Sequence, residues 1–408
     1  MSNQISTLRM EQKFKKTPAG EIPVDWEVVK LGDKISLEYG EGLIESKRKY
    51  GKYPVYGSNG IIGYHDNFLI KGPGIVVGRK GTIGAVSWSN IDFWPIDTTY
   101  YIKLFDNDLN LRWLYYKLKS LDLSKLNMAT GTPGLNRDIA CSQIIPLPPP
   151  AEQKKIADIL SAVDDAIDKT DAVIEKTKEL KKGLAQQLLY LGIQRHNKFK
   201  NSIGGKIPVG WQYLSLSEIT KDIYRYPTYY NIKYLANGVP EVRGELIRTN
   251  GKLESDKAQY RSISEETAAR FPRTRLNRGD LVLSVRGTIG KVAIVPEFLE
   301  GANMTANLIR ISPNQEIVEP KWLLQVFISD NFRHALDAAS SSTAIKTITA
   351  PDLKKIGIAI PSLSEQKEIV KLLSGVDLSI SHEEAHKHQL EQIKTALMQV
   401  LLTGKVRV

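Results

Sequence analysis

Two short stretches of the chain contain residue types that could do chemistry. His382-Glu383-Glu384-Ala385-His386 fits the H-E-x-x-H pattern, in which two histidines one helical turn apart bind zinc and the glutamate acts as a base. A catalytic zinc also needs a third protein ligand. The usual downstream spacings offer Gln389 or a position among the last residues, and neither is Glu or His. The stretch therefore predicts a polar part of a helix and no metal site, and a metalloprotease remains the alternative.

The second stretch, Gly287-Thr288-Ile289-Gly290-Lys291, looks at first like a phosphate loop. The Walker pattern requires Gly where Val285 stands and Ser or Thr where Val292 stands. The chain also has no G-x-G-x-x-G that opens a helix and no Asn/Asp-Pro-Pro-Tyr/Phe run of an amino-methyltransferase. We therefore expect no catalytic residues and no cofactor bound by the chain itself.

The Gly-Thr-Ile-Gly stretch instead belongs to an internal repeat, because Gly81-Thr82-Ile83-Gly84 has the same sequence. Further matches occur in the same order in both halves: Ile22-Pro23-Val24-Asp25-Trp26 with Ile207-Pro208-Val209-Gly210-Trp211, Glu152-Gln153-Lys154 with Glu365-Gln366-Lys367, and Leu184-Ala185-Gln186-Gln187-Leu188-Leu189 with Leu397-Met398-Gln399-Val400-Leu401-Leu402. Matches in register predict a tandem duplication of a globular part followed by a long helix. The second globular part is longer, by about 28 residues on these spacings, whereas the helical parts are equal in length.

The two helical parts show the heptad periodicity of helices that pack on each other. Residues 152–191 contain no proline and place apolar side chains at a and d positions, and the second copy repeats that register. Residues 160, 167, 174 and 188 widen the stripe, as a helix with more than one neighbour requires. The residues expected in the helix contact are Ile156, Ile159, Val163, Leu180, Leu184, Ile369, Leu372, Val376, Ile393 and Leu397.

At 1.5 Å per residue, a helix of about 40 residues spans roughly 60 Å. The globular parts alternate short β-branched and aromatic runs with glycine turns, which predicts short strands with a few helices. We therefore expect an α+β protein with two curved-sheet domains, joined by two long antiparallel coiled-coil helices in a pseudo-two-fold internal repeat. The predicted segments are residues 1–150, the first domain; 151–192, the first helix; 193–361, the second domain; and 362–408, the second helix.

Composition narrows the class of partner. The 408 residues carry a formal net charge of +11 at pH 7, which favours a polyanion such as nucleic acid or an anionic membrane surface. The single cysteine, Cys141, forms no internal disulfide and is typical of a reducing cytosol. No apolar run approaches the ~18 residues of a spanning helix, and residues 1–16 lack the apolar core of a signal peptide. We expect a cytoplasmic protein with no membrane partner.

The order and duplication of these motifs resemble those of one family, the specificity (S) subunit of type I restriction-modification enzymes. The resemblance covers nearly the whole chain. It is carried by the Ile-Pro-x-x-Trp starts, the two Gly-Thr-Ile-Gly stretches, Pro-Leu-Pro-Pro-Pro-Ala-Glu-Gln at 146–153, Ile-Pro-Ser-Leu-Ser-Glu-Gln at 360–366 and Leu-Leu-Thr-Gly-Lys-Val-Arg-Val at 401–408.

The resemblance implies that the chain is not an enzyme but the part of a larger complex that reads double-stranded DNA. Two target-recognition domains would each read one half of a bipartite site, while the helices set the unread spacer and dock two modification (methyltransferase) subunits. Those partners would bind S-adenosylmethionine and methylate adenine, and restriction subunits, which are translocases and nucleases, would use ATP and Mg²⁺. Because the second domain is longer, we expect the two half-sites to differ.

Phosphate contacts need Lys, Arg and exposed amides, and base reading needs Arg, Asn, Gln, Ser or Thr at a groove. In the first globular part we expect DNA contacts from Lys47, Arg48, Lys49, Tyr50, Arg79, Lys80, Thr82, Thr132 and Asn136. In the second we expect them from Arg225, Tyr226, Arg243, Arg248, Arg275, Arg286, Thr288, Lys291, Ser342 and Lys346. A coiled-coil scaffold without a nucleic-acid role is the remaining alternative, and salt-dependent DNA binding would exclude it.

Overall fold

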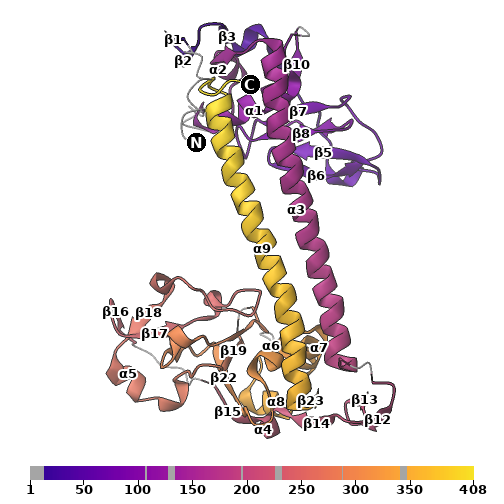
Figure 1. Cartoon of the computed structure of the whole chain (residues 1–408), viewed down its shortest axis with the longest axis vertical. Helices are drawn as coiled ribbons and strands as arrows, with labels where there is room; N and C mark the ends of the chain where they lie inside the picture. The colour runs from indigo at the N-terminus through magenta and orange to yellow at the C-terminus, as the bar shows by residue number, and fades with distance from the viewer. Residues whose placement is uncertain are drawn as a thin grey trace, which may run out of the picture. The chain divides into compact units, whose positions relative to one another are not determined.

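The computed structural model describes residues 13–105, 108–126, 134–193, 196–225, 232–286, 288–340 and 347–408. The chain divides into two compact units, which we call unit 1 (residues 1–172 and 383–408) and unit 2 (residues 173–382). Each unit contains one globular part and a stretch of both long helices, α3 (Pro150–Leu191) and α9 (Leu363–Leu401) (Figure 1).

Unit 1 is built around a four-stranded sheet in the order β4-β10-β7-β8, beside a three-stranded sheet in the order β6-β5-β9 and two strand pairs, β1-β2 and β3-β11. The strands are β1 (Phe14–Thr17), β2 (Gly20–Pro23), β3 (Glu27–Lys30), β4 (Ile35–Tyr39), β5 (Tyr53–Gly57), β6 (Gly60–His65), β7 (Gly74–Gly78), β8 (Val86–Ser89), β9 (Trp94–Pro95), β10 (Thr99–Leu104) and β11 (Ile144–Leu147). The short helices are α1 (Leu111–Ser120) and α2 (Arg137–Cys141).

Unit 2 repeats this plan with a four-stranded sheet in the order β15-β22-β19-β20 and the pairs β12-β13 and β14-β23. A second four-stranded sheet, β16-β18-β17-β21, accounts for part of its greater length. The strands are β12 (Phe199–Ser202), β13 (Gly205–Pro208), β14 (Gln212–Ser215), β15 (Thr220–Arg225), β16 (Tyr234–Leu235), β17 (Val239–Val242), β18 (Arg261–Ile263), β19 (Leu281–Ser284), β20 (Val292–Ile294), β21 (Asn303–Met304), β22 (Leu308–Pro313) and β23 (Gly357–Ile360). The short helices are α4 (Leu216–Ile219), α5 (Glu265–Ala269), α6 (Pro320–Ile328), α7 (Asp330–Ala339) and α8 (Ala350–Lys355). The predicted α+β class and internal repeat are confirmed.

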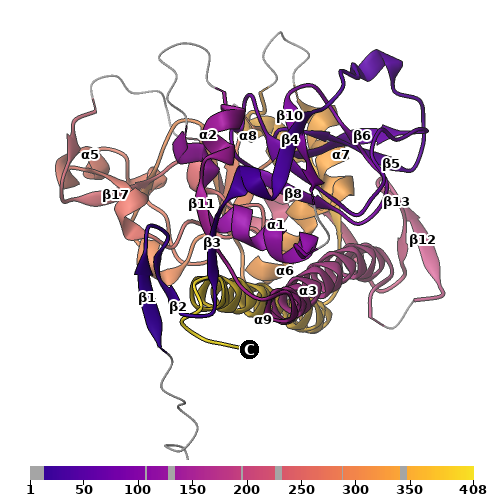
Figure 2. The ribbon, with the colours of Figure 1, turned by 90° about the horizontal axis from the view of Figure 1, so that it is seen from above.

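Each unit has a tryptophan-centred core between its sheet and its long helices. In unit 1, α1 lies between the strands of the four-stranded sheet and α3 (Figure 2). Trp113 on α1 and Trp322 on α6 are both fully buried. Asn110 caps α1, because its side chain accepts a hydrogen bond from the Trp113 amide. The same packing element therefore holds the sheet against the long helix in both copies.

The first residues of the two long helices make equivalent contacts in their own units. Glu152 accepts a hydrogen bond from Trp26 Nε1 at 2.9 Å, and Glu365 accepts one from Trp211 Nε1 at 3.2 Å. All four side chains belong to the motifs that repeat in the sequence. The repeated Ile-Pro-x-x-Trp and Glu-Gln motifs therefore join the start of each globular part to the start of a helix.

The two copies differ in the cation that completes this contact. In unit 1, Arg407 donates to both carboxylate oxygens of Glu152, at 2.6 and 2.8 Å, and to both of Asp25, at 2.8 and 2.6 Å. In unit 2, the place beside Glu365 is taken by His196, whose Nε2 lies 3.2 Å from the carboxylate. In unit 1, Arg407 therefore joins the C-terminal segment to Glu152 and Asp25 through four charge-assisted hydrogen bonds. In unit 2, the His196 ring takes the place of this guanidinium.

The helices are antiparallel, but the predicted contact register is partly wrong. Ion pairs Asp164–Lys394 and Asp171–Lys387 fix the opposite direction of α3 and α9 within unit 1. Leu180, Leu372 and Ile393, expected in the contact, are 65, 47 and 50 % exposed.

The error has a single cause. Ile159, Leu180, Leu372 and Ile393 share one heptad position of the repeat, and Ile159 is only half buried. Several other apolar side chains that are buried on the helices lie one residue after this heptad position, at Leu160, Ile174, Leu188, Leu373, Ile380 and Leu401. Ile156 and Ile369 are fully buried, while Val163, Leu184, Val376 and Leu397 are half buried. Each helix also packs on its globular core, which turns the buried stripe away from a strict coiled-coil seam.

Candidate nucleic-acid interface

The first Gly-Thr-Ile-Gly stretch is the turn of the hairpin between β7 and β8, and the described part of the second stretch, residues 288–290, lies in the equivalent turn between β19 and β20. The backbone bonds of the two turns match: Gly84 N donates to Gly78 O at 2.8 Å, and Gly290 N donates to Ser284 O at 3.0 Å. Gly84 and Gly290 have φ of 71° and 85°, a region that favours glycine. The repetition is therefore explained by the turn itself, and the side chains beside it are free to differ.

In unit 1 the turn lies beside an aromatic side chain with two cations above its ring. Tyr39, the last residue of β4, is 54 % exposed, and the guanidinium groups of Arg79 and Arg137 lie 5.0 and 5.7 Å from its ring centre. Arg79 also donates to Asp97 O from Nε and Nη2, at 3.1 and 2.6 Å. Stacking and these bonds hold Arg79 in place. The Arg79 guanidinium is thus held in one position. Lys80 and Thr82, by contrast, have exposed side chains.

A cavity of about 380 Å³ lies beside this group and is lined by Arg79, Lys80, Tyr100 and Asn136 among others. Burial raises the pKa of Tyr100 to about 12, so its hydroxyl stays protonated and donates to Leu135 O. The Asn136 side chain accepts from the amides of Asp138 and Ile139 and so caps α2. Its oxygen is therefore engaged in the fold, while the residue remains exposed at the edge of the cavity.

The predicted basic cluster at 47–50 separates into two kinds of side chain. Lys47, Lys49 and Tyr50 are exposed. Arg48 is turned inward and donates to Ile62 O at 2.9 Å and to Leu43 O at 3.4 Å. Arg48 therefore joins the loop before β5 to strand β6, and its contact with DNA stays a prediction.

In unit 2 the turn borders a cationic cavity of about 420 Å³. Its lining includes four cations, Arg243, Arg261, Arg286 and Lys291, together with Thr288, Ser284, Thr305, Asn307, Tyr234, Gly244 and one carboxylate, Glu245. Arg225, the last residue of β15, is close enough for the charge of Arg286 to act with burial in lowering its pKa. Five predicted residues of the second globular part are thus brought together: Arg225, Arg243, Arg286, Thr288 and Lys291.

Two other predicted arginines of unit 2 do not line this cavity. Arg248 forms an ion pair with Glu254, and Arg275 donates to Glu265 at 2.6 Å. Each has a carboxylate partner within its own part of the fold, which lowers its availability to a phosphate. The predicted Thr132, Tyr226, Ser342 and Lys346 lie outside the described residues.

Sequence reasoning missed Tyr39 in unit 1 and Arg261 and Tyr234 in unit 2. Tyr39 had a signal, because it and Arg225 are the last residues of the corresponding strands β4 and β15. Arg261 had none. Its guanidinium lies 5.1 Å from the Tyr234 ring centre. The two residues meet because β18 pairs with β16, which their spacing along the chain does not indicate.

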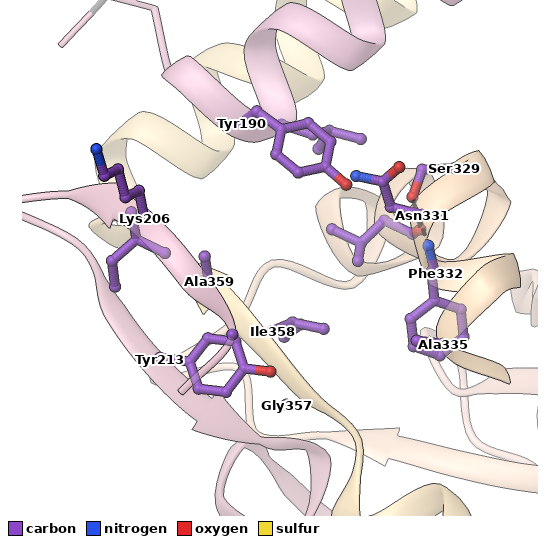
Figure 3. A pocket seen from close by; sticks show the side chains of 14 residues that line it. Tyr190, Lys206, Tyr213, Ser329, Asn331, Phe332, Ala335, Gly357, Ile358 and Ala359 are labelled. Carbon is purple, nitrogen blue, oxygen red and sulfur yellow. Dashed lines mark hydrogen bonds between the residues drawn. The ribbon is translucent and has the colours of Figure 1, made fainter. Parts of the chain in front are cut away.

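Other features of the structure do not suit a polyanion or a metal. The pocket of about 270 Å³ in Figure 3 is lined by aromatic and apolar side chains such as Tyr190, Tyr213 and Phe332, and Lys206 is its one charged lining residue. Over the described ranges, no group of three or more His, Cys, Asp or Glu is placed so that it could hold a metal ion. Among the helices that the structure describes, none is long and apolar enough to cross a membrane.

Comparison with known proteins gives a consistent picture. The family model described as "Type I restriction modification DNA specificity domain" matches the chain twice, over residues 23–179 and 208–392. The type I restriction enzyme MjaVIII specificity subunit of Methanocaldococcus jannaschii is 29% identical to this chain, covering 98% of it and 97% of its own length. The EcoBI specificity subunit of Escherichia coli is 27% identical over 73% of this chain and 65% of its own.

Solved structures with the same fold include the type I restriction-modification S subunit from M. genitalium. It has a TM-score of 0.57 and 17% identity over 96% of this chain and 99% of its own. A chain from a study of complex assembly and conformational transition of the type I R-M system has a TM-score of 0.54 and 16% identity, covering 94% and 99%. At this identity the likeness is one of fold.

Proposed function

The chain belongs to the family of type I restriction-modification DNA specificity subunits, and we propose that each of its units reads one half of a bipartite DNA site. One observation carries the proposal. The same hairpin turn beside the same kind of sheet carries an exposed tyrosine with two arginines in unit 1 and an open group of cations in unit 2. A shared scaffold with different polar surfaces suits two half-sites of different sequence.

We further infer that the chain contributes recognition while partner chains contribute chemistry. Two modification subunits would bind S-adenosylmethionine and methylate adenine, and restriction subunits would use ATP and Mg²⁺. The names of the relatives support this arrangement, since each is called the specificity subunit of an enzyme. In the assay, the purified chain should transfer no methyl group to DNA, and adding the modification partner should restore transfer. Methylation by the chain alone would overturn the proposal.

A map of methylated adenines in host DNA tests whether each unit reads one half-site. Cells carrying the gene should show one bipartite motif that vanishes when the gene is deleted. Replacing Tyr39 should change only one half of that motif, and replacing Arg225 only the other. A motif in which both halves change with either variant would contradict one half-site per unit.

The long helices are proposed to set the spacer between the half-sites. Inserting seven residues, two helical turns, at equivalent points of α3 and α9 adds about 10 Å to the pair. With base pairs ~3.4 Å apart, the unread spacer should lengthen by about three base pairs. The same methylation map should show both half-sites unchanged. Altered half-sites with an unaltered spacer would show that the helices are not the ruler.

A further inference from the structure

The cationic cavity of unit 2 contains positive charge that the fold leaves uncompensated. Over the described residues, neither the Arg286 guanidinium nor the Lys291 ammonium has a hydrogen-bond or ion-pair partner. Arg243, by contrast, donates to Glu245 at 2.6 Å and to Gln259 O at 2.8 Å. Among the described residues the Arg261 guanidinium also lacks such a partner, and it stacks on the Tyr234 ring at 5.1 Å. Three of the four cations therefore have no compensating charge, and two of them, Arg286 and Lys291, lie on the two sides of the turn.

The turn holds one of these two cations, Lys291, in a fixed frame. The Ser284 hydroxyl donates to Thr288 O and accepts from the Lys291 amide at 3.0 Å. Ser284 N also donates to Lys291 O at 2.8 Å. Because these bonds tie Thr288 and Lys291 to the end of β19, the Lys291 side chain starts from a position that ligand binding need not rearrange.

The surrounding charges favour an anion. Burial and then the charge of Arg286 lower the pKa of Arg225, which indicates that these two guanidinium groups repel each other. Glu245 is the one carboxylate in the lining, and it is paired with Arg243. Burial raises the pKa of Glu241, which lies on β17 near Arg243 and Arg261, and so disfavours its negative charge. A bound anion would relieve the repulsion that these groups leave.

We propose that this cavity is a phosphate site, in which Arg286 and Lys291 together grip one phosphodiester of the DNA backbone and Arg261 borders it. The inference rests on the proposed DNA-reading function and deepens it, because it assigns these residues to anchoring and not to reading. The chemistry favours phosphate over a base edge. Arg and Lys only donate, and a guanine edge offers acceptor atoms but no net charge to offset several converging cations.

Among the residues that the structure describes, the turn of unit 1 has no such pair of cations, and this provides a control within the same chain. By the alignment of the two turns, Lys80 stands at the place of Arg286 and Ala85 at the place of Lys291. Tyr39 in unit 1 corresponds to Arg225 in unit 2, because each is the last residue of its equivalent strand, β4 or β15. The proposed phosphate site is therefore assigned to unit 2. At the equivalent turn of unit 1, a substitution of Lys80 by glutamine removes one cation, because Ala85 carries no charge.

The first experiment measures how the affinity of the full-length chain for a mixed-sequence 40-base-pair duplex depends on KCl. For the variant R286Q/K291Q, the slope of log K against log salt should become shallower by about one, since both cations serve one phosphate. At fixed salt the affinity should fall about tenfold for every sequence alike. The matched control R270Q/R278Q removes the same formal charge from residues outside the cavity and should leave the slope unchanged.

A variant with the opposite expected sign separates the proposal from misfolding. E245Q removes the only carboxylate of the lining and should tighten binding and steepen the slope, which a damaged fold would not do. Ethylation interference on the selected target should lose one protected phosphate in R286Q/K291Q.

Three results would overturn the inference: an unchanged slope, an equal loss in the control, or a changed base preference at one position of the half-site. If the wild-type chain with its modification partner selects no DNA sequence at all, the proposed function fails instead, and the two failures are distinct.

Discussion

The ends of the two equivalent sheets show how one backbone carries two chemistries. In unit 1 the surface beside the turn is stacked: Arg79 is held between the Tyr39 ring and the Asp97 carbonyl oxygen, so its guanidinium has a fixed place. In unit 2 the corresponding surface is open, with Arg286 and Lys291 bordering a cavity. The difference teaches that the turn determines position and the flanking residues determine what is bound. Such a division lets a duplicated chain change its half-sites without changing its fold.

The two units also differ at the starts of α3 and α9, where unit 1 has an arginine and unit 2 a histidine beside the equivalent glutamate. We expect the largest difference in stability between the two units at this contact. Glu152 is buried and contacts Trp26 and Arg407, whereas Glu365 contacts Trp211 and the His196 ring. We expect E152A to destabilise unit 1 by about 3 kcal/mol, because it leaves Arg407 without one carboxylate in a partly buried place. E365A should cost unit 2 only about 1 kcal/mol.

Hydrogen exchange in peptides from each unit measures the two effects separately. The matched variants E152Q and E365Q keep the shape and should fall between wild type and alanine. Equal losses in the two units would show that Arg407 adds nothing to the contact.

The contact also predicts a pH dependence for unit 1. A hydrogen bond from Arg407 lowers the pKa of Asp25 below its ordinary value. The folded state therefore binds a proton less readily than the unfolded chain, and the stability it provides is present above the unfolded pKa and lost as pH falls through the folded one. R407Q should remove this acid-dependent loss, as followed by exchange in unit 1 between pH 5 and 3. Unit 2 serves as the internal reference.

The two units also differ at one position of the short helix that packs between the sheet and the long helix, α1 in unit 1 and α6 in unit 2. Lys117 on α1 is buried with one hydrogen bond, to Leu402 O at 3.4 Å, and burial lowers its pKa to about 8. Aligning the buried Trp113 and Trp322 places the apolar Val326 there in unit 2. Because charging Lys117 is harder in the folded state, unit 1 gains stability as pH rises from about 8 toward the unfolded value near 10.4.

We expect K117M to stabilise unit 1 by about 2 kcal/mol at pH 7, since it removes the cost of a buried charge. It should also abolish the alkaline gain in stability. K119M changes a neighbouring lysine that is exposed and should shift stability by less than about 0.5 kcal/mol. Thermal unfolding at pH 7 and 10 tests both, and a destabilised K117M would mean that the bond to Leu402 outweighs the burial of charge.

Sequence alone gave the repeat, the α+β class and the turns that border both surfaces, because these depend on local motifs whose spacing survives in both copies. It failed where geometry in space decides. Arg48 and Asn136 belong to basic or polar stretches, yet their polar atoms bond to the backbone of the fold. Leu180 matched an a/d pattern but faces solvent, because packing on the globular core rotates the stripe.

The surfaces themselves can be told apart by variants at equivalent strand ends. Y39A should remove the ring that orients Arg79 and Arg137, and should weaken recognition of one half-site by roughly 1–3 kcal/mol at a single base pair. Y39F keeps the ring and should behave as wild type. R225A should affect the other half-site only. Selection from a random duplex library, with the modification partner present, reads both halves at once. A uniform loss across sequences in Y39A would assign Tyr39 to backbone contact.

The smallest expected difference lies in the helix pair, at two carboxylates that correspond in the repeat. Asp164 pairs with Lys394 and Arg112 and accepts a hydrogen bond from Tyr116 at 2.6 Å, while Asp377 pairs with Lys181 at 2.7 Å and is more exposed. D164A should cost about 1 kcal/mol and D377A about 0.3 kcal/mol, since a solvent-exposed pair is worth little and a shared carboxylate holds several groups together.

Double-mutant cycles of Asp164 with Lys394, and of Asp377 with Lys181, isolate each pair from its surroundings. The first coupling should survive 0.5 M KCl better than the second, because salt screens exposed charges more strongly. If the two couplings are equal and vanish together in salt, the extra partners of Asp164 do not strengthen its pair.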